Sequence, residues 1–369
     1  MRVSKNPEKY LRYIIPSSLF GTHRTKQILT ANPIASLKRK DAEQINTTVY
    51  DYDANDLYEH ELKTVPECYG FKGNGKVTWV NIDGLRKKEV ENICEHYGIH
   101  HLVAEDILSV NQRPKMDEVD DILYCLLNML YFNEKDGVVE QEQVSIALGK
   151  DFVITFQEDP YKDVFNPIRE RLRMANSKLR QRGADYLCYT MLDLIVDNYF
   201  FVMEKLGEKT EMLEEEVIRD SNKRALVHIN QLRKELIVLK RNIVPVRDLV
   251  GGIIRSENEL LDENTIKYFK DVHDHIIQAH DLSENYRDVI ISMQDLYINN
   301  VNLRMNEVMK VMAIVTCLLA PPTVIGGIFG MNFRFIPSAN NQWGFYATVA
   351  IMLLIPAGML MIFKRRGWF

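Results

Sequence analysis

Apolar and polar residues follow two different periods along this chain, and the change falls near residue 165. Between residues 46 and 160, short runs rich in β-branched, aromatic or other apolar residues predict strands. From about residue 165 to residue 330, helix-forming residues dominate and glycine is scarce, which predicts long helices. The expected strands cover residues 47–50, 77–82, 122–127, 144–148 and 152–156, and the expected helices include 87–96, 104–109, 183–220, 223–255 and a run that begins near 262.

Two apolar runs follow one another near the C-terminus. Residues 311–333 are uncharged, and residues 345–363 form a second apolar run that ends at a basic cluster, 364–366. Each run is long enough for a hydrocarbon core of ~30 Å, which needs about 20 helical residues. A buried helix of a soluble protein would explain one such run, but two in succession favour membrane spans. The basic cluster and the large N-terminal part are both expected on the cytoplasmic side.

A polar seam runs along the third long helix in alternating steps of three and four residues, the spacing of packed parallel helices. The first part of the seam is acidic and amide-bearing, and the later part is small and weakly polar, whereas the positions beside it are large and aliphatic. Such a helix has one face for lipid and one face that water or ions could occupy. Close packing of small residues between helices explains the Ala and Gly but not the acids and amides. The seam consists of Asp288, Ser292, Asp295, Asn299, Asn302, Asn306, Met309, Ala313, Thr316, Ala320, Thr323, Gly327 and Gly330, with Met312 beside it.

Charge and motif content exclude several classes of function. The net charge of -5 gives no reason to expect a nucleic-acid partner. The first 45 residues are locally basic and fit a solvated extension better than an arm that binds lipid or RNA. The chain contains neither a GxxxxGK[ST] phosphate loop nor a nucleophile arrangement of Ser/His/Asp or Cys/His type, so no enzyme activity is expected. No pair of its five cysteines has CxxC spacing.

The tripeptide Gly330-Met331-Asn332 comes directly after the first of the two apolar runs. Together with Asn306–Val311, Glu105–Leu108 and residues 112–115, it resembles the CorA family of magnesium channels. The resemblance covers residues 46–369 and implies a homopentamer with an α/β cytoplasmic domain, a helical funnel or stalk, two C-terminal transmembrane helices and one central pore.

The resemblance also implies roles for individual residues. Gly330, Met331 and Asn332 would form the selectivity filter, where neutral oxygens hold hydrated Mg²⁺. Asp106 and Asp271 would form an intersubunit Mg²⁺ site that keeps the channel closed, although the residues alone indicate ordinary surface carboxylates. The outer loop 333–344 contains no acid, so the charge that concentrates cations is expected in the stalk. The residues expected to line the pore are Asp295, Asn299, Asn302, Asn306, Met309, Met312, Thr316, Ala320 and Thr323.

These patterns predict passive, potential-driven transport of hydrated Mg²⁺, with cobalt and nickel as further candidate ions, by an integral protein of the plasma (inner) membrane that is surrounded by lipid and has both termini in the cytoplasm. A zinc transporter on the same scaffold is the alternative, and a membrane-anchored scaffold or enzyme is the rival from another class. A histidine-rich stretch, 273–280, fits a solvated helix face better than a metal site. The expected organisation is a basic extension (1–45), an α/β domain (46–164), a helical hairpin (165–260), a stalk helix continuing into the first span (261–330), a loop (331–344), the second span (345–363) and a basic tail (364–369).

Overall fold

The computed structural model describes residues 41–162, 164–219, 222–331 and 342–368 of the 369-residue chain. The chain divides into two compact units. The first unit comprises the described residues up to Glu215 together with Val227–Ile291, and the second comprises Glu216–Leu226 and the chain from Ser292 onward.

A seven-stranded sheet forms the centre of the first unit, in the order β2-β1-β3-β7-β6-β5-β4. All neighbouring strands pair antiparallel except β3 and β7, which run parallel with Val80 opposite Ile154. The five expected strands are present, while the two edge strands, β2 and β4, were not predicted. The strands are β1 (Asn46–Tyr52), β2 (Leu57–Leu62), β3 (Val77–Asp83), β4 (Lys115–Val119), β5 (Ile122–Asn133), β6 (Val138–Leu148) and β7 (Phe152–Gln157).

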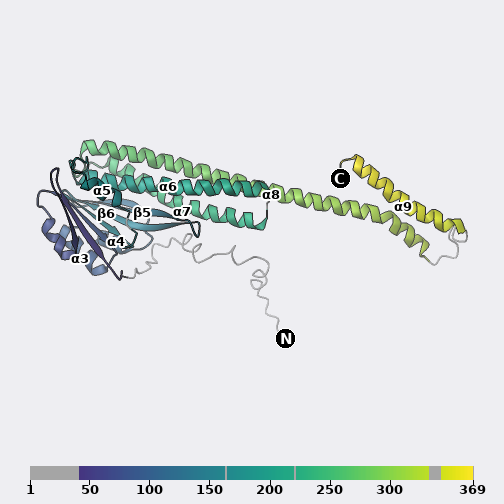
Figure 1. The fold of residues 1–369 in the computed structure, drawn as a ribbon, viewed down its shortest axis with the longest axis horizontal. Helices are drawn as coiled ribbons and strands as arrows, with labels where there is room; N and C mark the ends of the chain where they lie inside the picture. The colour runs from purple at the N-terminus through teal and green to yellow at the C-terminus, as the bar shows by residue number, and fades with distance from the viewer. Residues whose placement is uncertain (1–40, 163, 220–221, 332–341, 369) are drawn as a thin grey trace, which may run out of the picture. The chain divides into compact units, whose positions relative to one another are not determined.

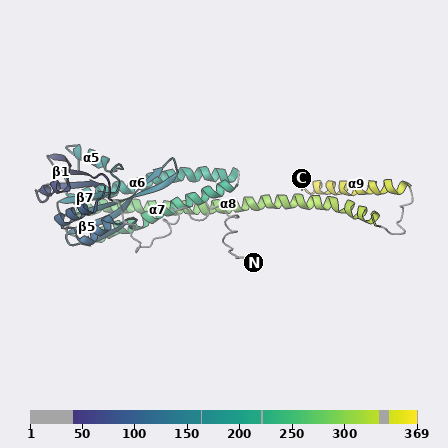
Figure 2. The ribbon, with the colours of Figure 1, turned by 90° about the horizontal axis from the view of Figure 1, so that it is seen from below.

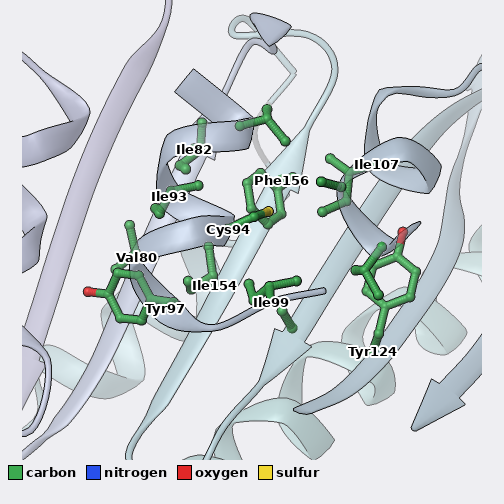
Figure 3. Packing of buried hydrophobic residues seen from close by; sticks show 14 of the residues in the cluster. Val80, Ile82, Ile93, Cys94, Tyr97, Ile99, Ile107, Tyr124, Ile154 and Phe156 are labelled. Carbon is green, nitrogen blue, oxygen red and sulfur yellow. The ribbon is translucent and has the colours of Figure 1, made fainter. Parts of the chain in front are cut away.

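One face of the sheet is covered by η1 (Val65–Phe71), α3 (Lys87–Tyr97) and α4 (His101–Leu108). Aliphatic side chains of β3 and β7, such as Val80 and Ile154, pack there against Ile93 of α3 and Ile107 of α4 (Figure 3). Helix α3 ends at Gly98, whose left-handed φ of 79° lets its N–H close on the carbonyl of Glu95.

The opposite face is covered by one short helix and three long ones (Figure 1). These are α5 (Asn166–Arg173), α6 (Ala184–Arg219), α7 (Lys223–Arg255) and the beginning of α8 (Glu263–Phe329). The Tyr199 hydroxyl of α6 donates to the Asn128 carbonyl of β5 at 2.7 Å, and the Asn128 amide donates to Asn242 of α7 at 2.8 Å. These buried bonds fix both helices on the sheet.

In the first unit, α8 buries one residue in every three or four along a single stripe. Phe269 packs edge-on against Tyr189 of α6, with ring centroids 5.9 Å apart. The stripe of buried residues consists of Thr265, Phe269, Val272, Ile276, Ala279, Ser283 and Ile290. This part of α8 therefore packs into a hydrophobic core formed by the same chain, as expected for an amphipathic helix.

The second unit contains the rest of α8 and the helix α9 (Gln342–Arg365), which Figure 2 shows at the C-terminal end of the chain. By length and composition, both helices can cross a membrane. Only 6% of the most apolar stretch of α8 and 0% of that of α9 are buried within the chain. At the end of α9 the N–H of Trp368 donates to the Phe363 carbonyl at 3.0 Å, and the two rings stack.

Candidate ion pathway and candidate cation sites

In the second unit, one face of α8 is covered by α9. Ile314 is the only residue of 294–329 that is buried, and Leu318, Pro321 and Ile325, which share its face, are half-buried. A Cβ on Gly326 would lie 3.4 Å from the Met352 Cε of α9, and Lys310 donates to the Gly367 carbonyl at 3.5 Å. α9 therefore runs back along this face of α8.

The seam predicted from the sequence lies about half a turn away from the covered face. At roughly 100° per residue, Met309, Thr316 and Thr323 fall on the opposite side of α8 from Ile314. Met309 is 61% exposed, and the remaining seam positions in this part, Met312 beside them included, are exposed as well. One chain thus leaves the whole seam uncovered.

The two seam threonines are oriented by their own helix. The Thr316 hydroxyl donates to the Met312 carbonyl at 2.8 Å, and the Thr323 hydroxyl donates to the Leu319 carbonyl at 2.7 Å. Because each hydroxyl proton is used in this way, the oxygen presents its lone pairs as an acceptor along the seam. An acceptor is what a cation or the water around it requires.

Towards the N-terminus, the seam continues along α8. Asp295, Asn299, Asn302 and Asn306 are all exposed. The neighbouring Asn300 lies on a different face, where its amide donates to the Val217 carbonyl of the same unit at 3.3 Å. A carboxylate and three amides therefore share one uncovered face, while the adjacent amide is used inside the unit.

The described part of the predicted filter, Gly330 and Met331, directly follows the end of α8 at Phe329. The N–H of Gly330 donates to the Gly326 carbonyl at 3.0 Å, and the N–H of Met331 donates to the Ile328 carbonyl at 3.3 Å. Met331 is 51% exposed. Asn332 and Arg334 lie outside the described residues, so the filter as a whole stays a prediction.

Asp106 lies in the last turn of α4, where it forms an ion pair with Lys115 of β4. The ammonium Nζ is 2.6 Å from Oδ2 of Asp106 and 2.7 Å from Oδ2 of Asp117. Burial of Lys115 opposes its charge, but the hydrogen bonds to the two carboxylates outweigh that effect and raise its pKa. Gln143 of β6 holds the end of α4 by donating to the carbonyls of Asp106 and Ile107, each at 3.3 Å.

Asp271 is exposed on α8 in the first unit. Within the described part of the chain, no hydrogen bond or ion pair joins it to Asp106. A single chain does not bring the two carboxylates into contact, and their meeting between subunits stays a prediction.

A cluster of side chains that could hold a cation, and that the sequence did not reveal, lies between α6 and α8. Ligand atoms of Asp193, Asp197 and His275 lie within 4.8 Å of one another. Burial and then the charge of Asp197 raise the pKa of Asp193. The Nδ1 of His275 is buried without a hydrogen-bond partner among the described residues. The sequence shows that the two aspartates lie four residues apart on α6. Only the register of α6 against α8 adds His275, which the sequence pattern had placed on a solvated face.

Known proteins resemble this chain over most of its length. The family model described as CorA-like Mg2+ transporter protein matches residues 74–365. The cobalt/magnesium transport protein CorA of Thermotoga maritima is 36% identical over 327 residues, which cover 88% of this chain and 93% of that protein. The putative metal ion transporter YfjQ of Bacillus subtilis is 30% identical and covers 79% of this chain and 89% of its own length. The complete structure of the CorA magnesium transporter from Methanocaldococcus jannaschii superposes with a TM-score of 0.73 at 24% identity, covering 88% of this chain and 98% of that one.

Proposed function

The chain belongs to the family of CorA-like Mg2+ transporter proteins, and from this premise we propose how it moves its ion. It is a membrane transport protein rather than an enzyme, and Mg²⁺ is the ion it carries. The similar proteins of Thermotoga maritima and Methanocaldococcus jannaschii are named for cobalt as well as magnesium, which makes Co²⁺ the second ion to test.

The proposed pathway is a central pore formed by five copies of α8. Two spans in one chain cannot enclose a pore, so the pathway needs a closed ring of subunits. The observation that carries this proposal is that the polar seam lies opposite the face that α9 covers. In a ring with α9 outside, the seam turns inward and the aliphatic residues turn to lipid or to neighbouring helices.

The proposed filter lies at the outer end of this pore, with both termini of the chain in the cytoplasm. Gly330, Met331 and Asn332 would contribute a ring of backbone and amide oxygens. Because Mg²⁺ gives up its water reluctantly, such a ring would accept hydrogen bonds from the hydrated ion rather than strip it. A potential of 100 mV supplies about 4.6 kcal/mol for a divalent ion entering the cell, so no further energy source is needed.

The proposed regulation uses carboxylates of the first unit. Asp106 and the neighbouring subunit's copy of Asp271 would bind a second, regulatory Mg²⁺, since hard cations prefer oxygen ligands. Asp193, Asp197 and His275 form a further candidate position within one chain, whose imidazole also suits transition metals. Loss of the ions would leave like charges facing one another and favour opening.

Ion uptake into liposomes that hold the full-length protein tests the transport proposal. We expect inward flux of Mg²⁺ under an inside-negative potential, with Co²⁺ and Ni²⁺ carried as well and Zn²⁺ poorly carried. Protein-free liposomes and liposomes without a potential are the controls. Absence of Mg²⁺ flux at every internal Mg²⁺ concentration, or a flux of Zn²⁺ alone, would refute the proposal in favour of the zinc alternative.

The regulatory proposal has its own test. Asp271→Lys should weaken the inhibition of uptake by internal Mg²⁺, because the introduced ammonium would repel the regulatory ion. Asp281→Lys, a matched change on the same helix, should leave the inhibition curve in place. Identical curves for wild type and Asp271→Lys would remove Asp271 from the regulatory site.

A further inference from the structure

The ammonium group of Lys115 contacts the Asp106 carboxylate, which the proposed regulatory ion would also bind. Its Nζ lies 2.6 Å from Oδ2 of Asp106 and 2.7 Å from Oδ2 of Asp117. Lys115 and Asp117 are two residues apart in β4 and so project from the same face of the strand, towards α4. The three side chains are only partly exposed, at 36%, 22% and 40% for Lys115, Asp106 and Asp117, so water screens the contact incompletely.

We propose that Lys115 is a built-in competitor of the regulatory divalent ion, a tethered cation that sets the Mg²⁺ concentration to which the first unit responds. The inference rests on the proposed regulatory role of Asp106. A divalent ion and an ammonium group cannot both take the same carboxylate oxygen at contact distance, because their charges repel and their positions coincide. Binding of the ion to Asp106 therefore requires Lys115 to move away.

Tethering gives Lys115 an advantage over free monovalent cations. A group held beside its partner acts at a high effective concentration, which dissolved potassium does not match. A divalent ion has a more favourable electrostatic energy with Asp106 and the neighbouring subunit's Asp271 than the singly charged ammonium group has. The arrangement thus makes the site respond to divalent rather than monovalent cations.

Asp117 gives the displaced ammonium a second partner. When an ion binds Asp106, Lys115 keeps its contact with Asp117, so displacement does not leave a half-buried charge unpaired. In the ion-free state, Lys115 also neutralises Asp106 and reduces its repulsion of other carboxylates. At low Mg²⁺, the repulsion between carboxylates that favours opening is then weaker than it would be without Lys115. Its strength depends on the fraction of time that Lys115 spends on Asp106 rather than on Asp117.

The test uses the full-length protein in detergent at constant ionic strength. It measures how protection against chymotrypsin and the unfolding temperature depend on the Mg²⁺ concentration, and the midpoints of these curves are compared between variants. Lys115→Gln removes the competitor and should lower the Mg²⁺ midpoint by up to about fivefold, the range of a partly exposed ion pair. Lys115→Arg keeps the charge and should stay near the wild-type midpoint. Asp117→Asn leaves Lys115 to Asp106 alone and should raise the midpoint by about threefold. Lys162→Gln, which breaks an ion pair with Glu140 elsewhere in the first unit, is the matched control.

The outcomes separate the inference from the proposal beneath it. An unchanged or raised midpoint for Lys115→Gln, in a protein whose wild type responds to Mg²⁺, would overturn the competitor role and leave the regulatory site in place. Such a result would make Lys115 a structural partner that positions Asp106. An Asp106→Asn variant with the wild-type midpoint would instead remove Asp106 from regulation and the inference with it.

Discussion

The two parts of α8 form one continuous helix but have different surroundings. In the first unit, Phe269, Val272 and Ile276 are fully buried against the chain's own helices and sheet. Between residues 294 and 329, in the second unit, only Ile314 is buried. The first part packs against its own chain, and the second part leaves aliphatic and polar faces uncovered within one chain.

This contrast separates stability from conduction along one helix. Side chains of the first part contribute to the folding free energy of a compact domain, since each one removed leaves a cavity. Side chains of the second part contribute little to the fold of a single chain and are free to serve the proposed pathway. Substitutions in the two parts should therefore fail in different assays.

The largest expected effect is on the first part. Phe269→Ala should lower the free energy of unfolding of the first unit by about 3–5 kcal/mol, the usual result of emptying a buried aromatic site. Leu303→Ala, at a position that is 61% exposed in the second part, should change it by less than about 0.5 kcal/mol. Unfolding can be followed by fluorescence of the buried Trp79 in a Trp343→Phe, Trp368→Phe background. Equal losses for the two variants would break the contrast.

The next largest effect concerns the proposed filter, Gly330-Met331-Asn332, which follows α8 in the sequence. Asn332→Ala should reduce Mg²⁺ flux by roughly two orders of magnitude, about 2.7 kcal/mol, because it would remove the proposed ring of amides that meets the hydrated ion. The unfolding of the first unit and the size of the oligomer should not change. Asn340→Ala, which removes an amide from the same loop, serves as the control. Wild-type uptake by Asn332→Ala would show that selection takes place elsewhere.

A pH effect should be confined to the first unit. Burial raises the pKa of Glu142 to about 7, while its carboxylate accepts from the Asp159 N–H and the Tyr131 hydroxyl. The folded state therefore holds this proton more tightly than the unfolded state. The stabilisation is present below the ordinary pKa of a glutamate and is lost as pH rises through about 7.

Denaturant titrations at pH 5 and pH 8 should show this loss as about 2 kcal/mol in the wild type. Glu142→Gln should reduce the difference, and the exposed Glu118→Gln should not. A difference that persists in Glu142→Gln would assign the pH dependence to other groups.

The smallest expected effect distinguishes neighbouring residues within the second part. In a Cys317→Ser background, Thr316→Cys on the seam should react with a charged thiol reagent about ten times faster than Val315→Cys, because the proposed pore would expose only the seam to water. The other four cysteines are buried in the first unit and supply a low background. Equal rates would mean that the seam is packed against other helices rather than lined by water.

The sequence predicted the strands whose side chains are mostly buried, because β-branched and aromatic runs such as Val77–Asp83 have a strong signal. It missed β2 and β4, whose sequences LYEHEL and KMDEV are rich in charge. Both lie at the edges of the sheet, where exposure permits polar residues. Lys115 lies in β4, so the partner of Asp106 was missed together with the strand that carries it.

By itself the sequence determined the two apolar spans, the long helix and the polar seam along it, because each of these is a periodic property of neighbouring residues. It also carried the tripeptide that led to the family. The tertiary structure alone decided which face of α8 is covered, that β3 pairs parallel with β7, and that Lys115 meets Asp106 and Asp117. It likewise brought His275 to Asp193 and Asp197. Most of these contacts join different helices or strands, and their register depends on how whole elements pack, which no local pattern encodes.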